Sequence, residues 1–485
     1  MVDHTAILLE NNTINQKSIP TVELTLIVGI GLALQFFLPF KIPFLAYSLI
    51  LVIVILFLSH PYHAMLLSFL VKPIIDMSWL TKAEGFISPG ILSMLYSPLF
   101  IAGILVPALA FINRKSVAGK SIRSRYDWII FIYLFLFGSL TLFKIISSPS
   151  YWFNSIDSYS RILSVTFFYF IGKYYFRQEE QRKELTWIII LSSVVPFTLT
   201  LFQKILGTNL MSFGQVADTG ALSAFYIEGR HNLLRISGVY EGIYELAFLS
   251  LFTVLLLATI KLSKSKFPVW GYIMLPLGVY FLYFTYSRSA WALFLFSLTF
   301  YLICKKKVGW LLLLLIGVGV LYITVPNVQY RYEDELGFVL GEKDFSTFGY
   351  GRGGKWIRLT EGFMSQDMLP KLIGNYGLGN PENQFLGIMF WYGYIGLTIF
   401  IMLIIYLTLV LLKKLKDISN DSSFDTEIKC LFACIIIGSY WIAGIGNQFS
   451  TMISTQWILW TWTGILLSDN TDKIDPEQTM TPIYS

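Results

Sequence analysis

Long apolar segments separated by short polar ones run through almost the whole chain. The apolar runs are about 17–25 residues long, the length that a helix needs to cross roughly 30 Å of hydrocarbon. Hydrocarbon offers no partner for backbone polar groups, and ten-residue alternating strands do not occur, so these runs predict membrane-spanning helices rather than a barrel. We predict an all-α polytopic membrane protein with about 14 transmembrane helices (12–14). The expected spans are approximately 22–40, 42–58, 62–80, 90–112, 127–146, 160–176, 185–206, 239–261, 268–286, 289–304, 309–325, 384–412, 428–446 and 452–468.

Composition supports this interpretation. The 485 residues are 55% hydrophobic and only 14% charged, whereas soluble domains carry about 25% charged residues. We therefore treat residues 1–485 as a single integral membrane domain. The net charge of +6 follows from the distribution of lysine and arginine among the loops, so we expect membrane lipids as partners and no nucleic acid.

The short basic loops predict the orientation of the chain. They occur at 114–125, 177–183, 261–266, 305–307 and 413–416, and with fourteen spans they all fall on one side. The positive-inside rule assigns this side to the cytoplasm, together with both termini. Two long loops then lie on the external face, at 207–238 and, between the eleventh and twelfth spans, at 326–383.

The larger external loop contains a polar, glycine-rich stretch, GYGRGGKWIR, with Trp356 in its middle. Its cations Arg352, Lys355 and Arg358 share one face if the stretch is helical. A solvated basic loop is the simpler interpretation. The functional hypothesis is an anion-binding patch, because a guanidinium offers a planar fork of donors suited to phosphate oxygens.

Two further arginines, Arg235 and Arg288, stand where external loops enter spans. An arginine at this depth is expensive unless it pairs, faces a wet cavity or extends toward the headgroups. Because the positive-inside rule does not call for charge on the external side, we expect both to bind a diphosphate group.

Several external residues are candidates for acid–base chemistry. Glu382 precedes Asn383 where the large loop enters a span, and Glu241 and Glu245 lie four residues apart on one predicted helix face. Each carboxylate is a candidate general base or a simple partner for the arginines, and His231 is a weaker candidate. The sequence has no zinc-binding, nucleotide-binding or DxD motif, so neither a metal nor a cofactor is expected.

Four short patterns in the second half occur together and in order: Arg235-Ile236-Ser237-Gly238; Ser287-Arg288-Ser289; Gly351-Arg352 with Trp356 and then Gly374, Gly377 and Gly379; and Asn383-Gln384-Phe385-Leu386 followed by Gly393 and Gly396. With the layout of many spans and one large late external loop, they resemble the O-antigen polymerase / O-antigen ligase superfamily. The ligase branch has a catalytic histidine immediately before the asparagine, where this chain has Glu382. The polymerase branch is therefore the better match.

The resemblance implies a fold similar to the C-type glycosyltransferases and an enzyme that joins oligosaccharide repeat units carried on undecaprenyl diphosphate. The reaction takes place at the external face of the bacterial cytoplasmic membrane and yields an O-antigen, as in lipopolysaccharide, a capsule or an exopolysaccharide. A flippase and a chain-length regulator are the expected protein partners. On this interpretation Arg235, Arg288, Arg352 and Arg358 bind the diphosphate, Glu382 is the base, and Asn383 orients it or the sugar.

Three alternatives remain open. The first is a ligase that transfers finished polysaccharide to a lipid or protein, and the second is a cell-wall glycan polymerase. The third belongs to a different class, a transporter or flippase for lipid-linked sugars, in which related halves and charges near mid-membrane are expected.

Overall fold

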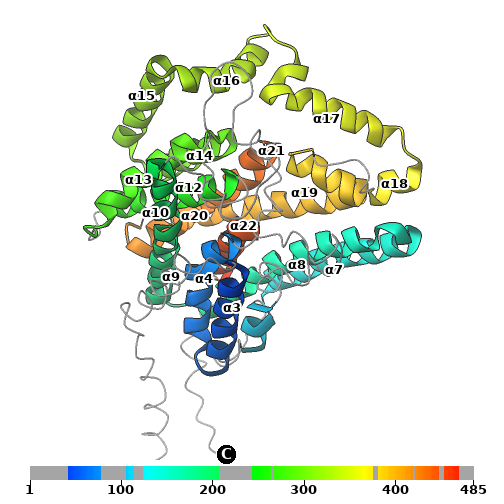
Figure 1. Cartoon of the computed structure of the whole chain (residues 1–485), viewed down its shortest axis with the longest axis horizontal. Coiled ribbons are helices and arrows are strands. Elements are labelled where there is room, and N and C mark those ends of the chain that lie inside the picture. Colours follow the sequence, from blue (N-terminus) through cyan, green and yellow to red (C-terminus); the bar gives the residue numbers. More distant parts are fainter. Residues whose placement is uncertain are drawn as a thin grey trace, which may run out of the picture.

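A computed structural model describes residues 42–77, 105–106, 108–113, 124–206, 243–263, 267–374, 381–418, 421–446 and 453–468. Within these ranges the chain forms helices and turns, and no strand (Figure 1). The helical elements are α3 (Ile42–Ser59), α4 (Pro61–Met77), α7 (Arg125–Ser147), η2 (Pro149–Tyr151), α8 (Trp152–Tyr175), α9 (Glu179–Ser192), α10 (Val194–Leu206), α12 (Ile243–Leu262), α13 (Gly271–Phe284), α14 (Arg288–Cys304), α15 (Val308–Thr324), α16 (Pro326–Val339), η4 (Phe345–Thr347), α17 (Phe348–Met364), α18 (Met368–Ile373), α19 (Gln384–Ile418), α20 (Phe424–Gly438), η6 (Ser439–Ala443), α21 (Gly444–Gly446) and α22 (Ile453–Ser468).

The predicted spans that fall within the described residues coincide with helices. The first predicted span lies outside these residues, and so does most of the fourth. The seventh, predicted as one helix, consists of α9 and α10 with a turn at Ser193. The thirteenth continues from α20 through the π-helical turn η6 into α21.

Five helical stretches in the described part of the chain are long and apolar enough to cross a membrane, namely Arg125–Ser147, Glu179–Phe202, Tyr244–Leu262, Gln384–Ile418 and Phe424–Ala443. Shorter apolar helices accompany them, including Arg288–Cys304 and Val308–Thr324. Many large apolar side chains on α7 and α19 are exposed, and α15 has no buried residue. Exposed apolar surface of this extent is expected where lipid covers a protein. The chain is therefore an all-α protein with the features of a membrane protein.

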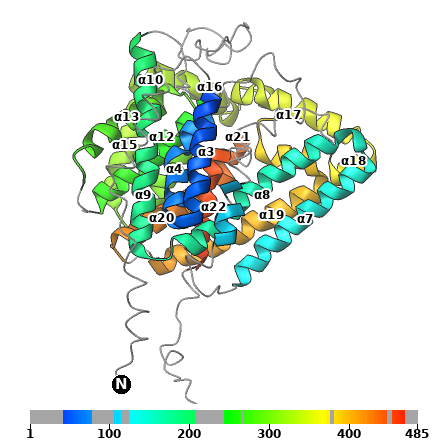
Figure 2. The ribbon, with the colours of Figure 1, turned by 60° about the horizontal axis from the view of Figure 1, so that its bottom comes forward.

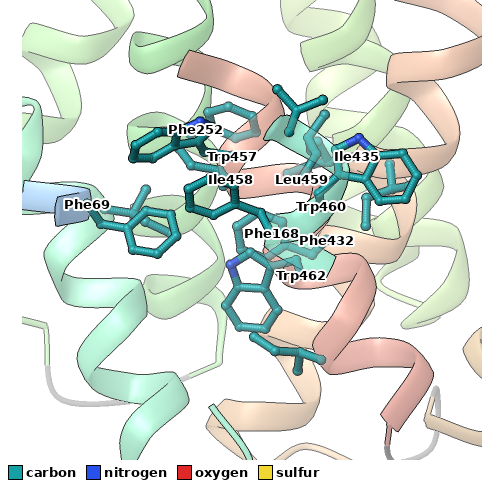
Figure 3. Packing of buried hydrophobic residues seen from close by; sticks show 14 of the residues in the cluster. Phe69, Phe168, Phe252, Phe432, Ile435, Trp457, Ile458, Leu459, Trp460 and Trp462 are labelled. Atoms are coloured by element: carbon teal, nitrogen blue, oxygen red, sulfur yellow. The ribbon is translucent and has the colours of Figure 1, made fainter. Parts of the chain in front are cut away.

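The core is aromatic and lies around α22, which packs along α8 (Figure 3). Trp457 stacks on Phe168 with ring centroids 4.1 Å apart, and Trp462 stacks on Phe432 at 4.2 Å. Gly172 and Gly464 let the backbones of α8 and α22 meet, because a Cβ at either position would collide with a carbonyl of the other helix. Small residues allow such close approach between membrane helices.

The described basic turns meet at one end of the bundle, which we call the basic end. Arg182, near the start of α9, donates two hydrogen bonds to the carboxylate of Asp425, of 2.6 and 2.7 Å. Lys307, after α14, reaches Glu427 at 3.4 Å and the carbonyl of Leu262, at the end of α12. The C-terminal ends of α12, α14 and α19 therefore lie at the basic end, and their N-terminal ends lie at the opposite, distal end.

At the distal end, the segment expected as a long loop (326–383) is largely helical within its described part. It forms α16, η4, α17 and α18. In Figure 1, α16 and α17 run across the top of the molecule and α18 lies at its right side. The glycine-rich stretch expected as an irregular loop belongs to α17. Gly353 is required there, because a Cβ would collide with the carbonyl oxygen of Phe345. Figure 2 shows α17 leading to α18 beside the outer ends of α7 and α8.

Candidate functional site

Two cations of α17 hold one carboxylate at the distal end. Arg352 Nη2 lies 2.8 Å from Glu382 Oε2, and Lys355 Nζ lies 3.2 Å from Glu382 Oε1. Arg352 and Lys355 are three residues apart, so they project from neighbouring positions on the helix surface. Glu382 stands two residues before α19 begins. The ion pairs thus close the external segment onto the start of the next long helix.

A tyrosine of a third element completes this group. Arg352 Nη2 also donates to the hydroxyl oxygen of Tyr244, 2.8 Å away, in the first turn of α12. Burial alone would lower the pKa of the Arg352 guanidinium, but Tyr244 and Glu382 outweigh it and the pKa lies above its ordinary value. Arg352 is therefore a fixed positive charge next to the N-terminal ends of two helices. Helix N-termini favour anions, as arginine does.

Glu382 has a strained backbone. Its φ of 52° lies in the left-handed region, which few residues other than glycine adopt. Such strain persists only where the surroundings fix it, and it is concentrated at functional sites. Burial alone would raise the pKa of the Glu382 carboxyl, but Arg352 and Lys355 together hold it below its ordinary value. In the structure, Glu382 is therefore ionised and acts as the counter-ion of both cations.

Trp356 and Asn383 position Glu382 from either side. The indole Nε1 of Trp356 donates to the carbonyl oxygen of Pro381 at 2.6 Å. Asn383 Oδ1 accepts a hydrogen bond from the backbone N–H of Leu386 at 3.0 Å, as an N-cap residue does, and its Nδ2 donates to the carbonyl oxygen of Ile445 at 3.0 Å. Asn383 thus caps α19 through Oδ1 and ties the start of α19 to α21 through Nδ2.

A second arginine–carboxylate pair lies at the start of α14. Arg288 pairs with Glu335 of α16. One turn later in α14 and one turn earlier in α16, the rings of Trp291 and Tyr332 are 6.1 Å apart. Tyr286, just before this turn, has a φ of 48°, so the backbone is strained here as well. Arg288, Trp291, Tyr332 and Glu335 form a clasp that joins α16 to the bundle.

Aromatic residues connect the clasp with the Glu382 group. Phe338 at the end of α16 contacts Phe345 and Phe348, and both of these rings lie about 6 Å from Trp356. Because Trp356 is bonded to Pro381, next to Glu382, α16 and α17 form a continuous packed layer between the two arginines.

The structure separates the other predicted site residues. Arg358 is exposed, and no ion pair with Glu382 is seen for it in the described part of the chain. Glu245 lines a small pocket with Lys72 among α4, α9, α12 and α22. Arg235, Glu241 and His231 lie outside the described residues.

Sequence reasoning missed two members of the site, Tyr244 and Glu335. Glu335 belongs to the acidic stretch YRYEDELGFVLGEKDF, which signals a partner for the basic stretch that follows. Neither its pairing with Arg288 nor that of Tyr244 with Arg352 follows from spacing, because the partners are 47 and 108 residues apart. Among the described residues, no group of three or more His, Cys, Asp or Glu side chains is arranged to hold a metal ion.

Comparison with known proteins adds no relative: no family model, no curated protein and no solved structure matches this chain.

Proposed function

We propose that this chain is a membrane glycosyltransferase that polymerises undecaprenyl-diphosphate-linked repeat units into a surface polysaccharide. One observation carries the proposal: two cations, Arg352 and Lys355, converge on the strained carboxylate Glu382 at the distal end. If the basic end faces the cytoplasm, as the positive-inside rule requires, this group faces the external side of the cytoplasmic membrane.

The charges suit the leaving group of such a reaction. A sugar hydroxyl of one unit attacks the anomeric carbon of the growing chain, the bond to the diphosphate oxygen breaks, and undecaprenyl diphosphate departs as an anion. Preorganised cations stabilise charge that develops in the transition state. Arg352 and Lys355 are assigned to this charge, and Arg288 to a second contact with the diphosphate or its neighbouring sugar.

The acceptor hydroxyl must lose a proton, and Glu382 is the proposed base. Its lowered pKa makes it a weak base while it neutralises Arg352 and Lys355. A bound diphosphate competes for the same two cations. Once they are paired with phosphate oxygens, the pKa of Glu382 rises toward the range in which a carboxylate accepts a proton efficiently. Substrate binding would thereby activate the base.

The test is gel analysis of surface polysaccharide from a deletion strain complemented with wild type, Arg352→Ala or Lys343→Ala. Lys343 is a cation of the same external segment that pairs with Glu333 instead. Wild type and Lys343→Ala should restore a ladder of polymer lengths, whereas Arg352→Ala should leave single repeat units. Full-length polymer that accumulates unattached in the deletion strain would select a ligase instead.

One observation favours a transporter of lipid-linked sugars as the second candidate. Lys72 and Glu245 line a pocket inside the bundle, and ionisable side chains at such depth often mark a transport path. In that case no oligosaccharide repeat units would reach the surface of the deletion strain.

A further inference from the structure

The corner at which α17 leads into α18 has an exposed apolar surface. Met364, Met368 and Leu369 are 50%, 68% and 47% exposed. The sulfur of Met364 lies 3.1 Å from the hydroxyl of Tyr394 on α19, and the next residue, Ile395, is also exposed. The surface therefore continues from the external segment onto a helix that is long enough to cross the membrane.

The position of this corner along α19 is fixed by two glycines. Gly393 breaks α19 with a φ of 67° and a ψ of −170°, and a Cβ there would collide with the backbone of Leu372 and Ile373. Gly374, directly after α18, packs in the same way against the backbone of Trp391 and Tyr392. The corner is thus pinned to the kink in α19.

The lengths of α19 and α7 place this kink at one boundary of the apolar band, the part of the bundle that would lie in hydrocarbon. Along α19, about 20 residues separate Gly393 from Lys413 at the basic end, which corresponds to roughly 30 Å. Along α7, Lys144 donates to the carbonyl oxygen of Trp391 at 2.7 Å, and about 19 residues, or roughly 28 Å, separate it from Arg125. Both lengths match the thickness of a bilayer's hydrocarbon core.

The exposed side chains agree with this boundary. On α19 the exposed large apolar residues begin at Ile395, just past the kink, and on α7 they extend as far as Ile146. Trp152, the first residue of α8, is also exposed, and tryptophan is enriched at membrane interfaces. Figures 1 and 2 both show α18 beside the outer ends of α7 and α8.

We propose that Met364, Met368 and Leu369 form an anchor that enters the headgroup region of the distal lipid leaflet. The occupant is lipid because the surface is continuous with the apolar faces of α7 and α19. Asp367 lies between Met364 and Met368, and Lys371 follows Leu369 by two residues. Charged residues beside apolar ones are typical of elements that lie in the interface plane.

The anchor has a consequence for the site, and this consequence rests on the proposed function. Lys355 and Met364 belong to the same helix, nine residues apart and so about 14 Å along its axis. A helix fixed in the headgroup region at one end holds its cations at a set height above the leaflet. This is the height at which the diphosphate of a membrane-anchored polyprenyl carrier is presented.

The test measures immersion, with a bimane fluorophore on a single introduced cysteine in lipid nanodiscs. Cys304→Ser serves as the background, because Cys430 and Cys434 are buried. Labels are placed by Met368→Cys, by Met402→Cys in the apolar band of α19, and by Val339→Cys on α16, where the side chain is 75% exposed away from the anchor. Quenching is compared for nitroxide lipids labelled at the headgroup or mid-chain and for aqueous iodide.

We expect the label at 368 to be quenched most strongly by headgroup nitroxides, the label at 402 by mid-chain nitroxides, and the label at 339 by iodide alone. A label at 368 that behaves like the one at 339 would overturn the anchor. So would a label shielded from every quencher until the protein is diluted to monomer, since a second copy would then cover the surface. Because immersion is read without activity, a fully active Arg352→Ala variant would remove the proposed function and leave the anchor standing.

Discussion

Arg352 and Glu382 are joined by an ion pair of 2.8 Å that closes the external segment onto the start of α19. The same guanidinium bonds Tyr244 of α12, and the same carboxylate bonds Lys355. A positive charge of raised pKa and a negative charge of lowered pKa thus hold each other in place. Any anion that binds here must compete with Glu382, which links the stability of the segment to its proposed chemistry.

Replacement of Glu382 by glutamine tests its role as base. Glutamine keeps the size of the side chain but cannot accept the proton, so we expect polymer formation to fall by about 100-fold or more. Incorporation of labelled repeat units by membranes with matched protein levels is the measurement. Glu361→Gln, at an exposed position of the same α17 helix, should retain wild-type activity. A wild-type rate of repeat-unit incorporation for Glu382→Gln would show that Glu382 has only a structural role.

The lowered pKa of Glu382 predicts how stability depends on pH. A carboxyl whose pKa falls on folding contributes stability above its ordinary value of about 4.3, and this contribution is lost as the pH falls through the lowered pKa. The melting temperature of the wild type in detergent should exceed that of Glu382→Gln by a constant amount from about pH 5 to 8. The difference should shrink below about pH 4. A difference that persists undiminished to pH 3 would show that the carboxylate charge is not its source.

The clasp can be tested by exchanging its charges. Arg288→Glu and Glu335→Arg should each destabilise the protein, because each places two like charges together. The double variant should recover, with a coupling of about 1 kcal/mol or more in a double-mutant cycle of unfolding free energies. If Arg288 also binds diphosphate, the double variant regains stability but not polymer formation. Recovery of both would reduce Arg288 to a structural role.

Gly393 is expected to be essential for the fold of the distal end. Its φ of 67° with ψ of −170° belongs to a region open almost only to glycine, where another residue costs about 1–3 kcal/mol. In Gly393→Ala the Cβ would also collide with the backbone of Leu372. We expect a loss above about 2 kcal/mol in unfolding free energy or a marked drop in folded yield.

Gly317→Ala is the matched control for Gly393→Ala. Gly317 lies in α15, where a Cβ would meet no atom within 4 Å beyond the adjoining backbone of its own helix, and alanine is the better helix former by about 1 kcal/mol. Folded yield, measured by fluorescence-detected size-exclusion chromatography, should be unchanged or higher for this variant. Similar losses of folded yield in both variants would show that the backbone conformation at Gly393 does not require glycine.

Asn383 is predicted to act through the capping of α19. Both Asn383→Asp and Asn383→Ala lose the donor to the carbonyl oxygen of Ile445, but aspartate keeps the oxygen that accepts from the backbone N–H of Leu386, whereas alanine loses it too. Alanine should therefore lower the unfolding free energy by about 1–2 kcal/mol, and aspartate by less. If both variants keep wild-type stability and lose activity, Asn383 contacts the substrate instead.

The sequence alone determined the helical class and most element positions, because crossing hydrocarbon demands long apolar runs with internally paired backbones. The run at 384–412 therefore marks α19, as the one at 127–146 marks α7. Charge and position also marked Arg288, Arg352, Lys355 and Glu382 as residues of interest. Their exact partners did not follow, because an arginine with several carboxylates in reach gives no local signal for its choice.

Tertiary structure decided the rest. The pairing of Arg288 with Glu335 depends on how α14 and α16 meet, and that of Arg352 with Tyr244 on how α17 and α12 meet. The partners are too far apart in the sequence for any periodicity to show these pairings. The low helix propensity of glycine predicts a loop for the glycine-rich stretch, since each glycine weakens a helix. It forms α17 because Phe345, Phe348 and Trp356 pack together and Gly353 admits the carbonyl of Phe345. Tertiary packing thus outweighs the low helix propensity of the stretch that carries Arg352 and Lys355.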